Sequence, residues 1–231
     1  MANEFFDFQE NTRARDVSCP TCECTQTITP VTVLHSDTDE LEKLFQGHLN
    51  TVTCSSCHAQ FRVQAPLLFR DDEHRFLVYY APLEDRGKWD EAEKQMRQIT
   101  ANVFGNASLD ELPDCRLTLT RRSFIEKIAL HLDGLDDRVV EYVKYQLYNN
   151  PEQNVDAVRY ELLYDFTASD DDKLAFILFD RESGTAQAAT HIPRHVYEEV
   201  AEAFLKDDDM REELEALFSG YYVNVEKLLF G

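Results

Sequence analysis

The sequence predicts an α+β fold with a zinc-ribbon-like β unit, a helical hairpin and a C-terminal unit of antiparallel strands and helices. Two C-x-x-C turns, at residues 19–22 and 54–57, are each followed by β-favouring residues. Two apolar stripes with helical spacing flank a Gly-Leu-Asp-Asp-Arg corner at residues 134–138. After residue 158, apolar runs separated by turn residues predict hairpins, and helical patterns close the chain.

Four cysteines form the predicted metal site. Cys19 and Cys22 occupy the first turn, and Cys54 and Cys57 occupy the second. A C-x-x-C turn brings two sulfurs together, so two such turns can supply the four thiolates of a tetrahedral zinc shell. Because a closed shell leaves no position for water or substrate, we expect a structural Zn²⁺ rather than a catalytic metal.

The two turns lie farther apart than the roughly 15–20 residues of a compact ribbon, so the intervening segment must hold an extra element. Residues 36–40 have the composition of a helix start, with acids in the first turn. Leu41, Leu44 and Phe45 follow at helical spacing, and we expect the helix to stop at Gly47. The sequence thus predicts a helical insertion in the ribbon.

Thiol–disulfide chemistry is the alternative use of the cysteine pairs. Cys-Pro-Thr-Cys at residues 19–22 resembles the active turn of glutaredoxins, in which a helix N-terminus stabilises the thiolate. Here the residues after Cys22 favour a strand rather than a helix, and the acidic Glu23 disfavours a thiolate beside it. We therefore favour a structural metal over a redox role.

Three other side chains could belong to such a site. Cys24 could replace a ligand, but C-x-C spacing competes poorly with two symmetrical turns, so we expect it just outside the shell. His58 could also substitute, yet four cysteines suffice, and we expect it to donate a hydrogen bond near the sulfurs or to face water. Cys115 opens a strand and is expected to be a buried small apolar residue.

The formal net charge of −21 over 231 residues limits the partners. Excess negative charge opposes binding to nucleic acids and to anionic membranes. Between residues 15 and 70, four basic residues are outnumbered by six acidic ones, so the ribbon itself is not basic. We expect protein partners, with no nucleic acid and no membrane.

Location follows from apolar runs and cysteine usage. No apolar run approaches the about 20 residues that cross a bilayer, and the first residues lack the basic region of a signal peptide. Six cysteines without an export signal indicate metal ligation in a reducing compartment. We therefore expect an acidic, cytoplasmic protein.

The remaining elements up to the corner follow from local composition. Strands are expected at residues 25–34, 59–68, 74–81 and 116–120, a helix at 89–103 and a loop at 105–113.

The corner at residues 134–138 joins the two predicted helices. Gly134 suits the left-handed position after the first helix, and Asp136 suits the N-cap of the second. Asp137 then lies near the positive end of the second helix dipole. An enzyme using Asp136, Asp137 and Arg138 for acid–base work is the alternative, but capping explains both carboxylates without a cleft.

The last third predicts strands and then helices. Strands are expected at residues 158–167, 174–180 and 186–192, and helices at 193–205, with Pro193 at the first helical position, and at 210–218. The acidic runs 170–172 and 207–209 are expected to be solvated loops and helix starts; divalent cation binding is the alternative. We expect His191 and His195 to diverge rather than to form a metal pair.

The predicted domains follow from these patterns. A leader spans residues 1–14, a cysteine-bearing domain with the helical hairpin spans 15–150, and a C-terminal α+β domain spans 151–231. The boundary is placed at residues 149–154, where Asn, Pro and Gln interrupt the pattern.

The chain resembles the CpXC family of bacterial and archaeal proteins over residues 15–150. The resemblance rests on the two cysteine turns, the Phe-Ile-Glu-Lys-Ile stretch at 124–128 and the 134–138 corner, in this order. Ser55 and Ser56 stand in the second turn where a strict pattern has a proline, which leaves the ligand spacing intact. The family is functionally uncharacterised, so the resemblance implies a metal-binding fold and no activity.

Taken together, these observations predict a zinc-binding protein that acts as a non-catalytic protein-interaction or scaffold module.

Overall fold

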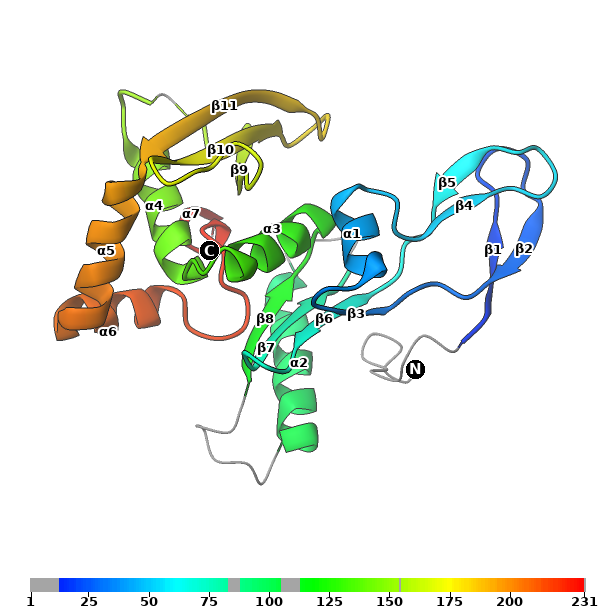
Figure 1. Cartoon of the computed structure of the whole chain (residues 1–231), viewed down its shortest axis with the longest axis horizontal. Coiled ribbons are helices and arrows are strands. Elements are labelled where there is room, and N and C mark those ends of the chain that lie inside the picture. The colour runs from blue at the N-terminus through cyan, green and yellow to red at the C-terminus, as the bar shows by residue number, and fades with distance from the viewer. Residues whose placement is uncertain (1–12, 83–87, 105–112, 154, 231) are drawn as a thin grey trace. The chain divides into compact units, whose positions relative to one another are not determined.

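The computed structural model describes residues 13–82, 88–104, 113–153 and 155–230 (Figure 1). Helices and several small sheets are mixed along these residues, which confirms the α+β class. The predicted leader lies outside the described residues up to residue 12, as does most of the loop predicted at 105–113. Among the described residues, none of the helices combines the length and apolar character that a bilayer crossing requires.

The chain divides into two compact units, residues 1–125 and 126–231. The division falls inside one helix, α3 (Arg121–Leu132). The domain boundary that the sequence suggests at residues 149–154 stays a prediction.

The first unit holds two short hairpins, a four-stranded sheet and helices. Its strands are β1 (Arg15–Ser18), β2 (Thr25–Ile28), β3 (Val33–His35), β4 (Thr51–Thr53), β5 (Gln60–Arg62), β6 (Leu67–Asp71), β7 (Phe76–Tyr80) and β8 (Asp114–Thr118). Its helices are α1 (Asp39–Phe45), α2 (Trp89–Phe104) and the start of α3.

The four-stranded sheet forms the core of this unit, in the order β3-β6-β7-β8. β3 is parallel to β6, β6 is antiparallel to β7, and β7 is parallel to β8. Phe69 on β6, Val78 on β7 and Leu117 on β8 are buried, as large apolar side chains in a core are expected to be.

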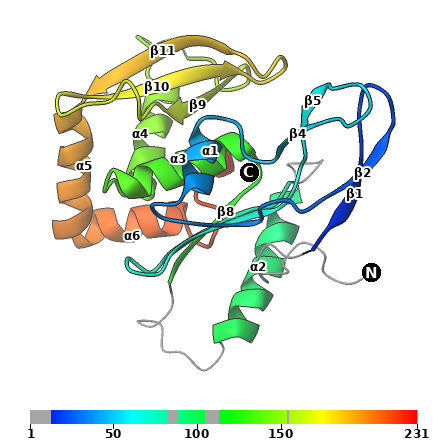
Figure 2. The same cartoon turned by 45° about the vertical axis from the view of Figure 1, so that its right-hand side comes forward.

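The two hairpins, β1–β2 and β4–β5, lie beside each other (Figure 2). The strand predicted at residues 25–34 is divided into β2 and β3, and the one predicted at 59–68 into β5 and β6. Proline explains both breaks, because Pro30 and Pro66 lack the N–H that a ladder position must donate. The helical insertion is confirmed as α1, with Thr38 at its N-cap.

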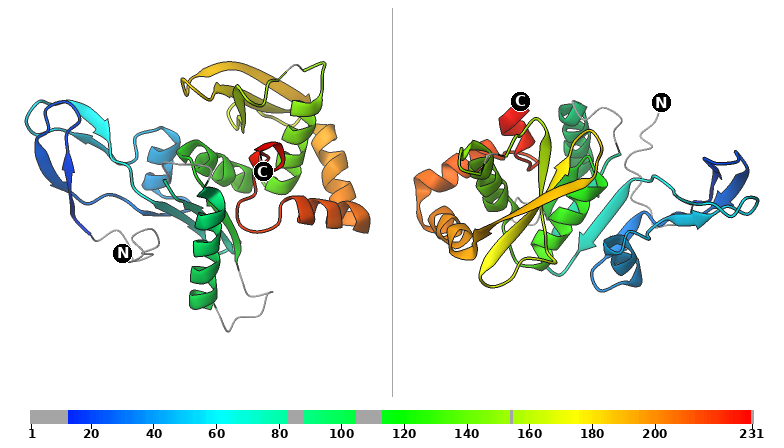
Figure 3. Two further views of the ribbon diagram at one scale, coloured as in Figure 1. Left: turned by 180° about the vertical axis from the view of Figure 1, so that it is seen from behind. Right: turned by 90° about the horizontal axis from the view of Figure 1, so that it is seen from above.

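The second unit holds helices and a three-stranded antiparallel sheet, β11-β10-β9, drawn in yellow in Figure 3. Its elements are the rest of α3, α4 (Asp137–Asn149), β9 (Tyr160–Tyr164), β10 (Lys173–Asp180), β11 (Ala186–Pro193), α5 (Arg194–Lys206), α6 (Asp208–Leu217) and α7 (Glu226–Phe230). Helix α5 contacts both β10 and α4, and α6 contacts α4 and α5. Val139, Phe176 and Leu214 are buried in this unit.

Helix ends follow the predicted chemistry in most places. Gly134 has a φ of +68°, and the side chain of Asp136 accepts a hydrogen bond from the Arg138 N–H at 2.9 Å, so both capping roles are confirmed. Asp207 caps α6 by accepting from the N–H groups of its first turn. Pro193 is the N-cap of α5 rather than its first helical residue, so the helix begins one residue later than predicted, at Arg194.

The acidic run at residues 170–172 closes a turn. The carboxylate of Asp170 accepts the backbone N–H groups of Asp172 and Lys173, each at 3.0 Å. Asp170 therefore stabilises a loop, and Asp207 caps the start of a helix, as the sequence predicts for the two acidic runs.

Candidate metal centre

The first C-x-x-C turn closes the hairpin between β1 and β2. Its backbone is fixed by the Cys19 N–H donating to the Cys24 carbonyl (3.0 Å) and the Glu23 N–H donating to the Cys19 carbonyl (2.9 Å). Within the turn, the Thr21 N–H donates to the sulfur of Cys19 at 3.4 Å. Glu23 adopts a left-handed conformation, with a φ of 59°.

The second turn, between β4 and β5, repeats this geometry. The Cys54 N–H donates to the Ala59 carbonyl (2.9 Å), and the His58 N–H donates to the Cys54 carbonyl (3.1 Å). The Ser56 N–H donates to the sulfur of Cys54 at 3.4 Å, and His58 has a φ of 61°. Two short hairpins therefore present the same loop, each with its first cysteine buried and its second exposed.

The four sulfurs meet between the two turns. The Cys19 sulfur lies 3.7 Å from that of Cys57, and the Cys22 sulfur lies 3.6 Å from that of Cys54. All four sulfurs lie within 4.8 Å of one another. A tetrahedral shell with metal–sulfur bonds of about 2.3 Å has edges of about 3.8 Å, whereas a disulfide needs about 2.05 Å. The predicted cysteines are therefore clustered at the separations of ligands around one metal ion.

Backbone amides favour the thiolate form of the two buried cysteines. The N–H groups of Cys57 and Ser56 lower the pKa of Cys54 to about 6. At Cys19 burial favours the thiol, but hydrogen bonds from Thr21 and Cys22 outweigh it and lower the pKa. At Cys22 the N–H of Cys24 favours the thiolate, but hydrogen bonding with Cys57 and burial outweigh it and raise the pKa to about 12.

The neighbouring candidates lie outside this cluster. Cys24 contacts the carbonyl of Thr25 at 3.8 Å through its sulfur, and neither it nor the exposed His58 belongs to a ligand group among the described residues. Cys115 is buried, with its sulfur 3.4 Å from the Pro113 carbonyl. These placements agree with the predictions for all three.

Gln26 joins the two hairpins and was not singled out by the sequence. Its Nε2 donates to the carbonyl of Thr53 (3.3 Å), and its Oε1 accepts from the N–H of Ser55 (3.0 Å). A lone Gln in a Thr-rich strand gives no signal of this role, because Ser55 lies 29 residues further along the chain.

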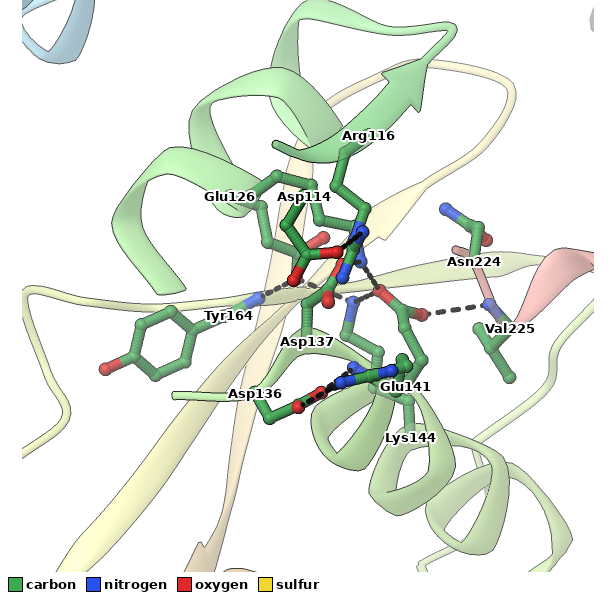
Figure 4. A network of polar contacts seen from close by, with 12 residues as sticks. Asp114, Arg116, Glu126, Asp136, Asp137, Glu141, Lys144, Tyr164, Asn224 and Val225 are labelled. Carbon is green, nitrogen blue, oxygen red and sulfur yellow. Dashed lines mark hydrogen bonds and ion pairs between the residues drawn. The ribbon is translucent and has the colours of Figure 1, made fainter. Parts of the chain in front are cut away.

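The corner residues of the enzyme alternative have separate contacts (Figure 4). Asp136, besides capping α4, forms an ion pair with Arg138 at 2.8 Å. Asp137 is buried and pairs with the ammonium group of Lys127 at 3.1 Å. The guanidinium of Arg138 lies over the ring of Phe204, 4.8 Å from its centroid.

A buried ionic network extends from Asp137 through the second unit. The carboxylate of Glu141 accepts from Lys127 (2.9 Å), from Lys144 (3.0 Å) and from the N–H of Val225 (2.9 Å). Lys144 also contacts Glu126 at 2.6 Å, and Figure 4 shows these groups converging between α3 and α4.

Burial and pairing oppose each other in this network. Burial disfavours the charge on Glu141, but Lys127 and Lys144 outweigh it and lower the pKa. Burial likewise opposes the charge on Lys144, but Glu126 and Glu141 outweigh it and raise the pKa. At Glu126 burial dominates and raises the pKa. The sequence pointed to the Glu126–Lys127 stretch only through its resemblance to a family, and it did not single out Glu141 or Lys144.

His191 and His195 lie on different elements, β11 and α5. Both are exposed, and among the described residues neither belongs to a group of metal-ligating side chains.

Neither the curated proteins nor the solved structures include a significant match to this chain. A family model described as "CpXC protein" matches residues 17–144, which is more than half of the chain. The matched region contains both cysteine turns, and it ends at Lys144 of the buried network. The chain therefore belongs to the CpXC family.

Proposed function

We propose that the four-cysteine cluster holds a structural Zn²⁺ and that the chain is a non-catalytic protein-interaction or scaffold module. The observation that carries the proposal is the separation of the sulfurs, 3.6 Å and 3.7 Å across the two turns, which matches the edges of a tetrahedral thiolate shell. Zinc is the metal that such closed, redox-inert shells most often take.

The size of the hairpins supports a structural role for the metal. Their strands have three or four residues each, too few for an isolated hairpin to be stable in water. A zinc ion bound by four cysteines contributes about 10–16 kcal/mol of apparent folding free energy in peptides at neutral pH. We infer that the metal holds the two turns together and so orders both hairpins as a zinc ribbon.

The surface of the hairpins supports a protein partner. Thr51 and Thr53 on β4 and Gln60 on β5 are exposed, and Thr25 and Thr27 on β2 are exposed as well. These side chains are uncharged, and they offer hydrogen-bond donors and acceptors to a protein partner. The proposed location is the cytoplasm, where free thiolates remain available to zinc.

The proposal is tested by the metal content of the purified chain, measured by mass spectrometry together with a count of reactive thiols under native conditions. We expect one zinc per chain and four protected thiols. Cys54→Ser removes a buried ligand and should release the metal and lower the melting temperature. Cys57→Ser, at an exposed ligand, should also release it, and Cys24→Ser, outside the cluster, should retain it.

A chain that carries no metal and forms a reversible Cys19–Cys22 disulfide would contradict the proposal and favour a redox role. Iron in place of zinc would contradict the choice of metal but not the ligand set.

A further inference from the structure

Two stretches of the first unit lack acidic residues although the chain has 44 of them. Residues 43–70 contain no Asp or Glu and include Lys43, Arg62 and Arg70. Residues 115–125 also contain none and include three arginines. The count of charged residues over 15–70 did not reveal a pair of arginines, because Arg62 lies in that range whereas Arg121 lies in the second stretch.

The structure brings one arginine from each stretch to the same turn. Arg62, on β5, donates from Nη2 to the carbonyl of Gly47 at 2.6 Å. Arg121, the first residue of α3, donates from Nη2 to the carbonyl of Leu49 at 3.2 Å. The two carbonyls are two residues apart in the turn that follows α1, so both guanidinium groups are anchored to the same short turn.

Neither guanidinium is neutralised by a carboxylate. Among the described residues, Arg62 and Arg121 form no ion pair, whereas Arg70 in the same unit is paired with Asp72 at 2.9 Å. A guanidinium has five N–H donors, and each of these two arginines uses one nitrogen on a main-chain carbonyl. The Nε of Arg121 is buried and has no hydrogen-bond partner.

This arrangement is electrostatically unfavourable on its own. Burial and then the charge of Arg62 lower the pKa of Arg121 to about 10. A buried donor without an acceptor and a like-charge pair without a counterion both destabilise a fold. An anion held by the remaining Nη donors of both arginines would offset this repulsion.

We propose that Arg62 and Arg121 form a binding site for the phosphate group of a small molecule. Two guanidinium groups offer a double positive charge and planar pairs of donors, which suit a phosphate dianion better than a single carboxylate. Arg62 is exposed, so the site is open to solvent. Helix α3 also begins at Arg121, and the positive end of its dipole adds to the attraction for an anion.

The alternative is that both arginines only cap the carbonyls that follow α1. Capping uses one nitrogen of each guanidinium and assigns no role to the buried Nε of Arg121. Capping and anion binding predict different results when each arginine is replaced, because a cap affects stability whereas a binding site affects affinity.

The test is calorimetric titration of the zinc-loaded full chain with inorganic phosphate and pyrophosphate, with acetate as the monocarboxylate comparison. We expect saturable binding of both phosphate probes and at least tenfold weaker binding of acetate. Arg62→Gln and Arg121→Gln should each weaken phosphate binding at least tenfold. Arg70→Gln is the matched control, because it removes the same charge from a carboxylate-paired arginine, and it should change the affinity less than twofold.

Arg121→Lys separates a loss of binding from a folding defect. Lysine keeps the positive charge but replaces the planar guanidinium, with its several donor nitrogens, by a single ammonium group. This variant should retain the melting temperature and bind phosphate more weakly than the wild type. The proposal is overturned if the wild type binds no phosphate saturably, if acetate binds as tightly, or if the glutamine variants lose stability but keep their phosphate affinity. If a single-stranded oligonucleotide binds more tightly than pyrophosphate, and Arg62→Gln weakens that binding, the proposal of a small-molecule ligand is wrong.

Discussion

Gln26 on β2 is hydrogen-bonded to Ser55 in the second cysteine turn, through its Oε1 and the Ser55 N–H at 3.0 Å. The same side chain donates to the carbonyl of Thr53 at the end of β4. The amide thus links the two hairpins, because it contacts both the end of β4 and the backbone of the second cysteine turn.

Gln26→Ala should weaken metal binding without removing a ligand. Loss of a hydrogen-bonding partner around a metal site typically lowers affinity about 10–100-fold. The measurement is competition with a chelator of known zinc affinity. Gln46→Ala is the control, since Gln46 is exposed and, among the residues that the structure describes, its side chain bonds Glu42 one turn earlier. Equal affinities in the two variants would show that Gln26 does not organise the site.

His58→Gly should keep the metal and stabilise the fold. His58 has a φ of 61°, in the left-handed region that disfavours residues with a Cβ by about 1–2 kcal/mol. Glycine relieves this strain but loses more entropy on folding, so we expect a net gain of up to about 1 kcal/mol. Glu23→Gly should behave alike, because Glu23 holds the equivalent position in the first turn. Thermal unfolding with a zinc assay checks both variants, and loss of zinc in His58→Gly alone would identify His58 as a ligand.

The cysteine cluster and the helix caps could be predicted because their signals are local. Two C-x-x-C turns each fix the separation of their own sulfurs, and Gly134 and Asp136 act on the backbone beside them. The strands predicted at 25–34 and 59–68 were too long, because β-favouring composition does not show where a strand changes its partner. β3 pairs with β6 and β4 with β5, and Pro30 and Pro66 interrupt the two predicted strands.

The other contacts join residues that are distant in the chain. Gln26 with Ser55, Arg121 with Leu49, and Glu141 with Val225 are separated by 29, 72 and 84 positions. Hydrophobic periodicity places a residue on a helix face but does not say which polar group it meets there. Lys127 and Lys144 illustrate the limit, because long charged side chains are normally exposed and both are buried here.

Glu141→Gln should destabilise the second unit by about 3–5 kcal/mol. Removing one member of a buried, paired set leaves the opposite charges without compensation. Glu141 binds two lysines, and the N–H of Val225 ties the C-terminal segment to α4 through it. Urea unfolding measures the loss.

The control for Glu141→Gln is Glu202→Gln, at an exposed pair with Lys206 one turn away in α5. That variant should leave the melting temperature almost unchanged. Similar shifts in the two variants would mean that the buried network contributes no more than a surface ion pair.

Glu126→Gln and Glu141→Gln should change the pH dependence of the unfolding free energy in opposite directions, because the pKa of Glu126 is raised and that of Glu141 is lowered. The pKa of Glu126 is raised by burial, although Lys144 lies 2.6 Å from its Oε1, and its Oε2 has no hydrogen-bond partner among the described residues. The folded state therefore keeps a proton on Glu126 at pH values where the unfolded state has lost it. Stability from this group is fully present below the unfolded pKa and is lost as the pH rises through the folded pKa.

Glutamine has the shape of the protonated acid and cannot ionise, so Glu126→Gln should gain stability relative to the wild type as the pH rises from 5 to 8. The pKa of Glu141 is lowered, so its stabilisation is present above the unfolded pKa and is lost only as the pH falls through the folded value. Glu141→Gln should therefore approach the wild type at acid pH. Urea unfolding of the three proteins across this range checks both slopes. A constant difference between Glu126→Gln and the wild type at every pH would mean that Glu126 is ionised in the folded protein, held as a carboxylate by Lys144.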